Sequence, residues 1–593
     1  MANRFWVTGG TGDWNSTTNW STTSGGASGA SVPGSGDAAL LDAASGSGVV
    51  TLDISPTIQT MTCTGFTGTL AFGTNTISLN STGTIFTGAL TMTVTGTPLI
   101  IATNSSATAR TITPTAVTEA NSISFRVTAG TGTLALSTGA YRDLDFTDGT
   151  NPTGYAGAMS NAAPTIYGSF KASTGMTKTA GSGVFTFAAT SGTKTIATAG
   201  VTFDNPFTFN GVGGTWQLQD ALTSGSARTC TLTNGSLDLN NFTLTTGFFL
   251  ASNSNIRSVA FGTGNITLTG SGSAIWSMAT ATNFTYTGTP TVNCTYSGAV
   301  GTRSITNGNT GASGTETNSV SFNISAGTDI VLFTATARVK NVNFTGFAGT
   351  LSGSSALLCY GNLTYSTGMT IAAATNPTIF GATSGTQLIT TNGKTLDLPL
   401  SFNGAGGTFV FQDALTQGST KAFTVTNGTV QLKDSATSTV GAFATSGTNQ
   451  KFLQSTSSGV QATLSQASGT VDTNYLTITD INATGGATFN AYVTNNNVNA
   501  GNNTGWDFYL PVNSIYDSLR LRGYTGTVTD MLLQYYKANG ATSNSLQDAE
   551  SEFLIIKGFT SGSNTDKWYA YLRSLSFTGT VTDMLFNYWK DPA

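Results

Sequence analysis

The chain contains no histidine, and charged residues make up only 8% of its 593 positions. The absence of histidine excludes Ser-His-Asp and Cys-His catalytic sites and histidine-ligated metal centres. The formal net charge is −4 at pH 7, so the sequence offers no broad electropositive surface of the kind that follows a phosphate backbone. We therefore expect no nucleic-acid partner, no metal site and no other cofactor.

Cysteines and long apolar runs are also scarce. The four cysteines lie 64 or more residues apart and have no metal-binding spacing: Cys63, Cys230, Cys294 and Cys359. We expect buried thiols, with a disulfide between neighbouring coils as the alternative. No stretch approaches the roughly 18 apolar residues of a membrane-spanning helix, and the first residues, MANRFWVTGGTGDW, have no apolar secretion-signal core. Insertion into a membrane is not expected.

Glycine, by contrast, is abundant: its 72 positions lie among Thr, Ser and Asn, together with 34 Phe. Apolar and polar residues alternate in short runs such as TLAF, TISL, LTMTV and LTITDI, which is the period-two pattern of strands with one buried face. The hydrophobic share of 38% argues against a disordered linker. The sequence therefore predicts a mainly β protein built from many short strands.

A long internal repeat organises these strands. FNGVGGTWQLQDALTSGS at Phe209 returns as FNGAGGTFVFQDALTQGS at Phe402, 193 positions later, within a gap-free match of about seventy residues. Each copy spans about 190 residues, enough for eight to ten coils of about 20 residues or for one to two β-sandwich domains. Because the strands are short and carry few residues able to fill a wide sandwich core, whereas stacked coils need only a thin apolar seam, we favour an elongated β-solenoid over tandem β domains.

The composition divides the chain into five predicted parts. Residues 1–54 form a Trp-rich amino-terminal cap or attachment segment, where Trp6, Trp14 and Trp20 can shield the open end of a solenoid. The two repeat copies span residues 55–245 and 246–440. They are followed by a closing β segment, 441–510, and by a small helical module, 511–593.

The predicted helical module carries its own tandem repeat, because TGTVTDML at Thr525 recurs letter for letter at Thr578. In each copy one of two threonines is expected to cap a helix, Thr527 or Thr529 in the first and Thr580 or Thr582 in the second. The repeated helices end in paired aromatics: Tyr535, Tyr536, Tyr588 and Trp589. These four rings either close the core of the module or form a docking face for a partner.

One acidic cluster is the candidate for chemistry. In YRDLDFTDG, Asp143 and Asp145 share a face of a predicted strand, and Asp148 follows in the turn. Such carboxylates suit a Ca²⁺ site or the acid and base of a polysaccharide depolymerase. The second copy has Asn341 and Asn343 in the corresponding stretch. That exchange favours a structural polar face, and we do not expect an enzyme.

Both ends of the chain resemble one class of proteins. The segments RFW, GGTGDWNSTTNWS and VPGSGD, the later TITDINATGGATFNA and GNNTGWDF, and the tandem unit GYTGTVTDMLLQYY are similar to β-solenoid appendage and adhesin-like proteins of bacteriophages and prophages. This resemblance implies a virion protein that assembles in the host cytoplasm as a homotrimer. Its implied partners are other virion proteins and a host surface polysaccharide or receptor.

The expected function is therefore that of a structural and adhesive virion protein, a tail fibre or appendage that contributes to host attachment. A capsid-bound decoration protein or head fibre is the alternative within the same class. A polysaccharide depolymerase on a β-solenoid is the enzymatic alternative.

Overall fold

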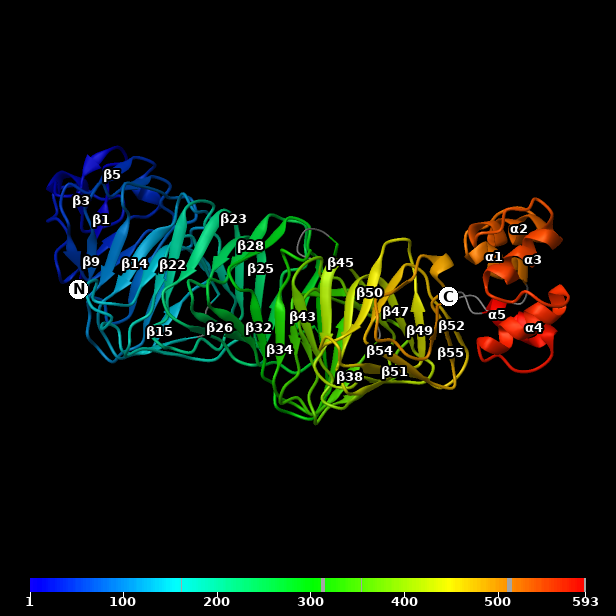
Figure 1. Cartoon of the computed structure of the whole chain (residues 1–593). Helices are drawn as coiled ribbons and strands as arrows, with labels where there is room; N and C mark the ends of the chain where they lie inside the picture. The colour runs from blue at the N-terminus through cyan, green and yellow to red at the C-terminus, as the bar shows by residue number, and fades with distance from the viewer. Residues whose placement is uncertain (161–162, 273, 311–314, 354, 509–514, 591–593) are drawn as a thin grey trace. The chain divides into compact units, whose positions relative to one another are not determined.

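The computed structural model describes residues 1–160, 163–272, 274–310, 315–353, 355–508 and 515–590. Strands account for 41% of the chain and helices for 10%, and the strands wind into a β-solenoid of about 21 turns (Figure 1). Five helices follow in the sequence. The prediction of a mainly β solenoid with a small helical module is confirmed.

The chain divides into two compact units. The first contains residues 1–489 and 498–506 and holds the solenoid, and the second contains residues 490–497 and 507–593 and holds the helices. The boundaries of the five parts drawn from the sequence stay predictions.

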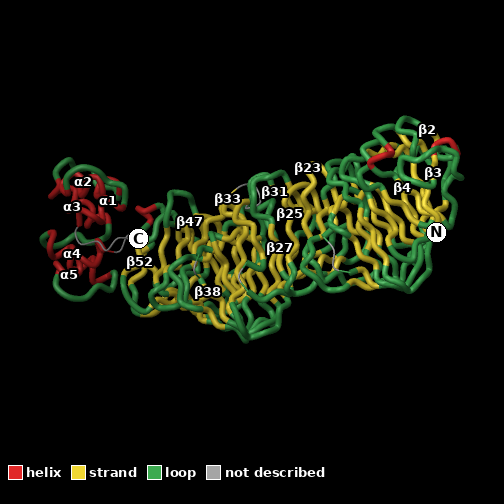
Figure 2. Tube along the Cα trace, turned by 180° about the vertical axis from the view of Figure 1, so that it is seen from behind, coloured by secondary structure: helices red, strands yellow, loops and turns green. Residues whose placement is uncertain are grey.

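Successive coils of the solenoid pair through parallel strands. β14 (Ile123–Val127), for example, pairs in parallel with β12 (Leu99–Ala102) of the preceding coil and with β16 (Gly139–Asp145) of the following one. Figure 2 shows the strands stacked side by side through the solenoid. Because side chains alternate between the two faces of a strand, mainly apolar residues fill the interior, together with some buried polar ones such as Arg303 and Asp329.

The internal repeat appears as repeated packing in the core. β23 (Phe207–Leu218) and β45 (Leu400–Phe411) occupy equivalent places. The rings of Phe187 and Phe209 stack with centroids 5.2 Å apart and planes 14° apart, and Phe380 stacks on Phe402 at 4.9 Å and 8°. Ladders of stacked rings therefore stabilise the same coils in both copies.

Both long strands bend at a glycine cluster. Gly213 in β23 and Gly406 in β45 have φ of +88° and +93°, a conformation that L side chains rarely adopt. A Cβ atom on Gly211 or Gly404 would overlap the carbonyl oxygen of Ala189 or Ala382 in the preceding coil. The repeated FNGVGG and FNGAGG motifs thus allow close approach of one coil to the next.

The amino-terminal coils contain the three clustered tryptophans. β1 (Ala2–Trp6) pairs in parallel with β4 (Asp37–Leu40) and, on its other edge, antiparallel with β3 (Trp20–Ser21). Trp6, Trp14 and Trp20 are fully buried, and the Trp20 ring lies 5.3 Å and 4.8 Å from the other two. These rings fill the interior at this end of the solenoid.

All four cysteines are buried and free. Burial raises the pKa of the Cys294 and Cys359 thiols to about 12 and raises that of Cys63 and Cys230 further. The prediction of buried thiols is confirmed, and the alternative of a disulfide between coils is not found.

The second unit contains five helices: α1 (Ile515–Leu521), α2 (Val528–Ala538), α3 (Leu546–Ile556), α4 (Asn564–Ser574) and α5 (Val581–Lys590). Thr527 caps α2 through a capping box with Asp530, and Thr580 makes the same contacts with Asp583 before α5. The first threonine of each predicted pair is therefore the cap.

In the described part of the chain, no helix has both the length and the apolar character needed to cross a membrane.

Candidate functional site

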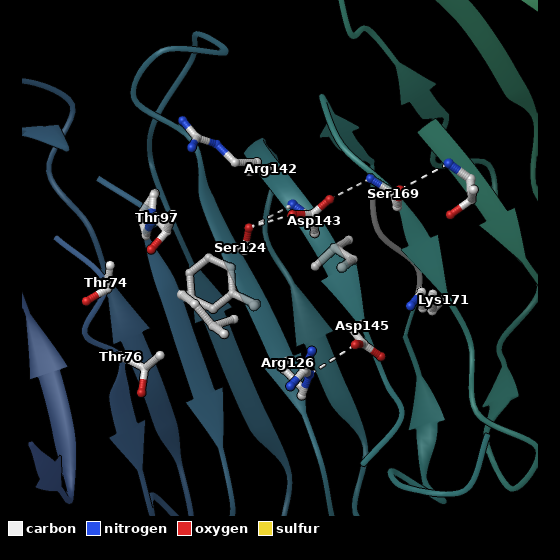
Figure 3. A pocket seen from close by; sticks show the side chains of 15 residues that line it. Thr74, Thr76, Thr97, Ser124, Arg126, Arg142, Asp143, Asp145, Ser169 and Lys171 are labelled. Atoms are coloured by element: carbon white, nitrogen blue, oxygen red, sulfur yellow. Dashed lines mark hydrogen bonds and ion pairs between the residues drawn. The ribbon is translucent and has the colours of Figure 1, made fainter. Parts of the chain in front are cut away.

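A hollow of about 600 Å³ opens on one face of the solenoid, and Asp143 and Asp145 line it. The lining comes from the turn before β9 (Ile77–Leu79) and from β12, β14, β16, β19 (Phe170–Lys171) and β22 (Thr193–Ala197). These strands follow one another in a single parallel sheet. We call this hollow the charged groove (Figure 3).

A β-bulge in β16 determines which side chains face the groove. Ile123 of β14 pairs with Tyr141, whereas Phe125, two residues later, pairs with Leu144. The extra residue in β16 lets Arg142 and Asp143 both point outward while Tyr141 and Leu144 stay buried. The bulge therefore places a cation and an anion side by side at the surface.

Asp143 belongs to a chain of hydrogen bonds that crosses successive coils. The Ser124 hydroxyl donates to Asp143 Oδ2 at 2.8 Å, and the Ser169 backbone N–H donates to Oδ1 at 2.7 Å. The Thr195 N–H in turn donates to Ser169 Oγ at 3.0 Å. Figure 3 shows this connection running across the groove. Both oxygens of Asp143 thus hold coils together.

The second repeat contains the same chain of contacts with an amide in place of the carboxylate. Asn341 donates from Nδ2 to Ser321 Oγ at 2.9 Å, and its Oδ1 accepts from the Asn362 N–H at 2.8 Å. The Leu388 N–H donates to Asn362 Oδ1 at 2.8 Å. Asp143 and Asn341 are therefore equivalent links between coils.

Asp145 is also fully engaged. Its Oδ2 accepts from Nε of Arg126 at 3.0 Å, and its Oδ1 accepts from the backbone N–H and the hydroxyl of Thr147 at 2.9 Å and 2.6 Å. A glycoside hydrolase needs one carboxyl group that delivers a proton and a second that attacks or activates water. Each side-chain oxygen of Asp143 and Asp145 already accepts a hydrogen bond from the protein. This arrangement does not favour either catalytic role.

Asp148 lies outside the groove lining, in the turn after β16. Its Oδ1 accepts from the N–H groups of Asn151 and Thr150 at 2.6 Å and 2.8 Å, and its Oδ2 accepts from Asn151 Nδ2 at 3.0 Å. These hydrogen bonds, above all those from Asn151, lower the pKa of Asp148. No group of three or more Cys, Asp or Glu side chains within the described ranges is arranged to hold a metal ion. The structure brings Asp143 and Asp145 together, and Asp148 stabilises a turn.

The four aromatic residues of the helical unit lie together. Tyr535, Tyr536 and Trp589 are 6%, 2% and 2% exposed and belong to the hydrophobic core of the unit, against which Tyr588 packs partly buried. The hydroxyls of Tyr535 and Tyr588 hydrogen-bond to each other at 2.6 Å. The rings thus close the core of this unit, and a docking face made from them stays a prediction.

Sequence reasoning did not identify the cations of the charged groove, which are Arg126, Arg142 and Lys171. A signal was present in the repeat, because Asn323 and Thr364 occupy the places of Arg126 and Lys171 in the second copy. Two of the three cations therefore distinguish the two copies of the fold, whereas Lys340 keeps a cation at the place of Arg142.

Comparisons of the chain with protein-family models, with curated proteins and with solved structures find no match.

Proposed function

We propose that the protein is a structural and adhesive component of a bacteriophage virion, a tail fibre or similar appendage that contributes to attachment to the host. The observation that carries this proposal is the stack of about 21 coils. In such a stack each inner strand satisfies its backbone hydrogen bonds with the coils on either side, so repetition extends the structure without a new core at each step. This architecture suits a shaft, and the resemblance at both ends of the sequence supports the same role.

The contacts in the charged groove favour a protein without enzymatic activity. Asp143, the best candidate for a catalytic carboxylate, makes the same two contacts as Asn341 of the second copy. An amide cannot act as a general acid or base, so the shared arrangement supports a structural role for both residues. A depolymerase is the second candidate function, and a capsid-bound decoration protein or head fibre is the alternative within the structural class.

Assembly as a homotrimer in the host cytoplasm is part of the proposal. Three copies in one appendage would present three equivalent sets of surface contacts. Linked contacts raise the effective concentration of each further contact once the first has formed. Weak binding by each chain would then suffice for stable attachment to a host polysaccharide or receptor.

Gold labelling of intact virions tests this proposal. Separate antibodies against residues 1–54 and 511–593 are applied to virions of the phage that encodes the chain, and the label is located by electron microscopy. Label at the tail supports the fibre and shows which end is distal, whereas label over the head supports the decoration protein. Virions that bind neither antibody, while the isolated protein binds both, would overturn the virion role.

A further inference from the structure

The charged groove contains more positive charge than its own carboxylates neutralise. Arg126, Arg142 and Lys171 line it together with two aspartates, whereas the whole chain has a net charge of −4. Within the described residues, the side chains of Arg142 and Lys171 make no hydrogen bond or ion pair. Arg126 bonds only through Nε, to Asp145, and its charge also acts on Asp148 just outside the lining. The groove thus offers several charged donors that the protein itself leaves unused.

On the equivalent face of the second copy, asparagine side chains bond to one another and to the backbone. Asn293 donates from Nδ2 to Asn265 Oδ1 at 3.1 Å, and Asn323, which takes the place of Arg126, donates to Asn293 Oδ1 at 2.9 Å. Asn343 stands where the first copy has Asp145, and its Oδ1 accepts from the N–H of Thr345 at 2.9 Å. Because both copies build the same coils, the fold does not require cations at the places of Arg126 and Lys171; at the place of Arg142 the second copy has another cation, Lys340.

The other polar groups of the groove suit a hydroxylated ligand. Thr74, Thr76 and Thr195 line it on coils before and after the charged residues, and their hydroxyls make no hydrogen bond with a described residue. Neighbouring strands lie about 4.8 Å apart, which is similar to the length of one sugar ring in an extended chain. A polysaccharide lying across the strands would therefore meet a new set of side chains at about every ring.

We propose that the charged groove binds an anionic polysaccharide, with Arg126, Arg142 and Lys171 contacting its acidic groups and the threonines contacting its hydroxyls. This inference rests on the proposed adhesive function and specifies the chemical class of the host ligand that the charged groove would bind. Charged hydrogen bonds of this kind are stronger than neutral ones. The acidic group is a sugar carboxylate or a phosphodiester, and the experiment distinguishes these two sources.

Binding is measured by isothermal titration of the full chain with four polymers: polygalacturonate, polysialic acid, glycerol-phosphate teichoic acid and neutral dextran. We expect binding of at least one anionic polymer and none of dextran. The first two polymers report a carboxylate ligand, and the third reports a phosphodiester. Failure of all three anionic polymers to bind, or equally tight binding of dextran, overturns the proposal.

The second repeat supplies the test variant. Arg126→Asn, Asp145→Asn and Lys171→Thr together install the residues that the second copy has at these places, and they should weaken binding by about tenfold or more. Lys340→Gln, which changes the net charge equally but lies in the second copy, should leave binding within about twofold. Undiminished binding by the triple variant contradicts the proposal.

A single substitution in the groove and the gold labelling of virions allow failure of the groove assignment to be told apart from failure of the virion role. If the triple variant does not fold, the single variant Lys171→Thr tests the proposal instead. Lys171 is exposed, so this variant should fold, and the loss of its charge should still weaken binding measurably. Binding by the isolated chain reports the groove only, whereas gold labelling reports the place on the virion. If the isolated chain binds an anionic polymer but virions are not labelled, the virion role is overturned and the groove assignment remains. If virions are labelled but the chain binds none of the anionic polymers, the groove assignment is overturned and the virion role remains.

Discussion

Arg303 and Asp329 form a two-point ion pair inside the solenoid, with Nε–Oδ2 and Nη2–Oδ1 distances of 2.7 Å. Both side chains are 1% exposed. The rings of Tyr296 and Phe347 lie 5.5 Å and 5.6 Å from the guanidinium carbon. Water therefore cannot replace the carboxylate if it is lost, and the cation would be left buried without its partner.

We predict that Asp329→Asn lowers the free energy of unfolding by about 3–5 kcal/mol, the usual cost of breaking a buried pair by removing one charge. Denaturant unfolding, followed by the circular dichroism of the strands, measures the change. Asp397→Asn is the matched control, because Asp397 is 41% exposed and lies 3.5 Å from Lys421. The control should cost at most about 1 kcal/mol, and equal losses in the two variants would contradict the prediction.

The cap of α2 gives a second prediction. The Thr527 hydroxyl contacts the carboxylate of Asp530 at 2.6 Å, and the Asp530 N–H donates to the threonine oxygen at 3.3 Å. Thr527→Ala should destabilise the helical unit by about 1 kcal/mol, the usual cost of losing a cap. The helical circular dichroism signal of the full chain, followed through denaturation, measures this. Thr529→Ala, at the second residue of the helix, should have a clearly smaller effect.

The same capping boxes predict how the helical unit responds to acid. Hydrogen bonds from Thr527 and Ser563 lower the pKa of Asp530 and Asp566. A carboxyl group whose pKa is lower in the folded state adds stability that is complete above its unfolded pKa, about 3.9, and is lost as the pH falls through the folded value. We therefore expect the denaturant concentration at the midpoint of the helical unfolding transition to decrease as the pH is lowered below about 4.

Asparagine at both positions supplies the control for this pH dependence. The Asp530→Asn and Asp566→Asn double variant can still accept hydrogen bonds at the two helix starts but does not titrate. Its midpoint should change less between neutral pH and about pH 3 than that of the unchanged protein. An identical loss in both proteins would assign the acid sensitivity to other groups.

The sequence predicted the solenoid because alternation and the long repeat are local and periodic signals. It also predicted that Asp143 and Asp145 share a face, since both lie in one strand. The charged groove was not predictable in the same way. Its lining extends from Thr74 to Thr195, and these residues meet only through the lengths of the intervening coils and the bulge in β16, which no short motif encodes.

The last prediction concerns Asp143 and separates a link between coils from a catalytic group. Because Asn341 makes the equivalent contacts in the second copy, Asp143→Asn should change the free energy of unfolding by no more than about 0.5 kcal/mol. Asp143→Ala leaves the Ser169 N–H without its acceptor and should cost about 1–3 kcal/mol. Denaturant unfolding of both variants is combined with an assay for reducing sugar released from host polysaccharide. Release by the unchanged protein that Asp143→Asn abolishes, without loss of stability, would contradict the structural role and support the depolymerase.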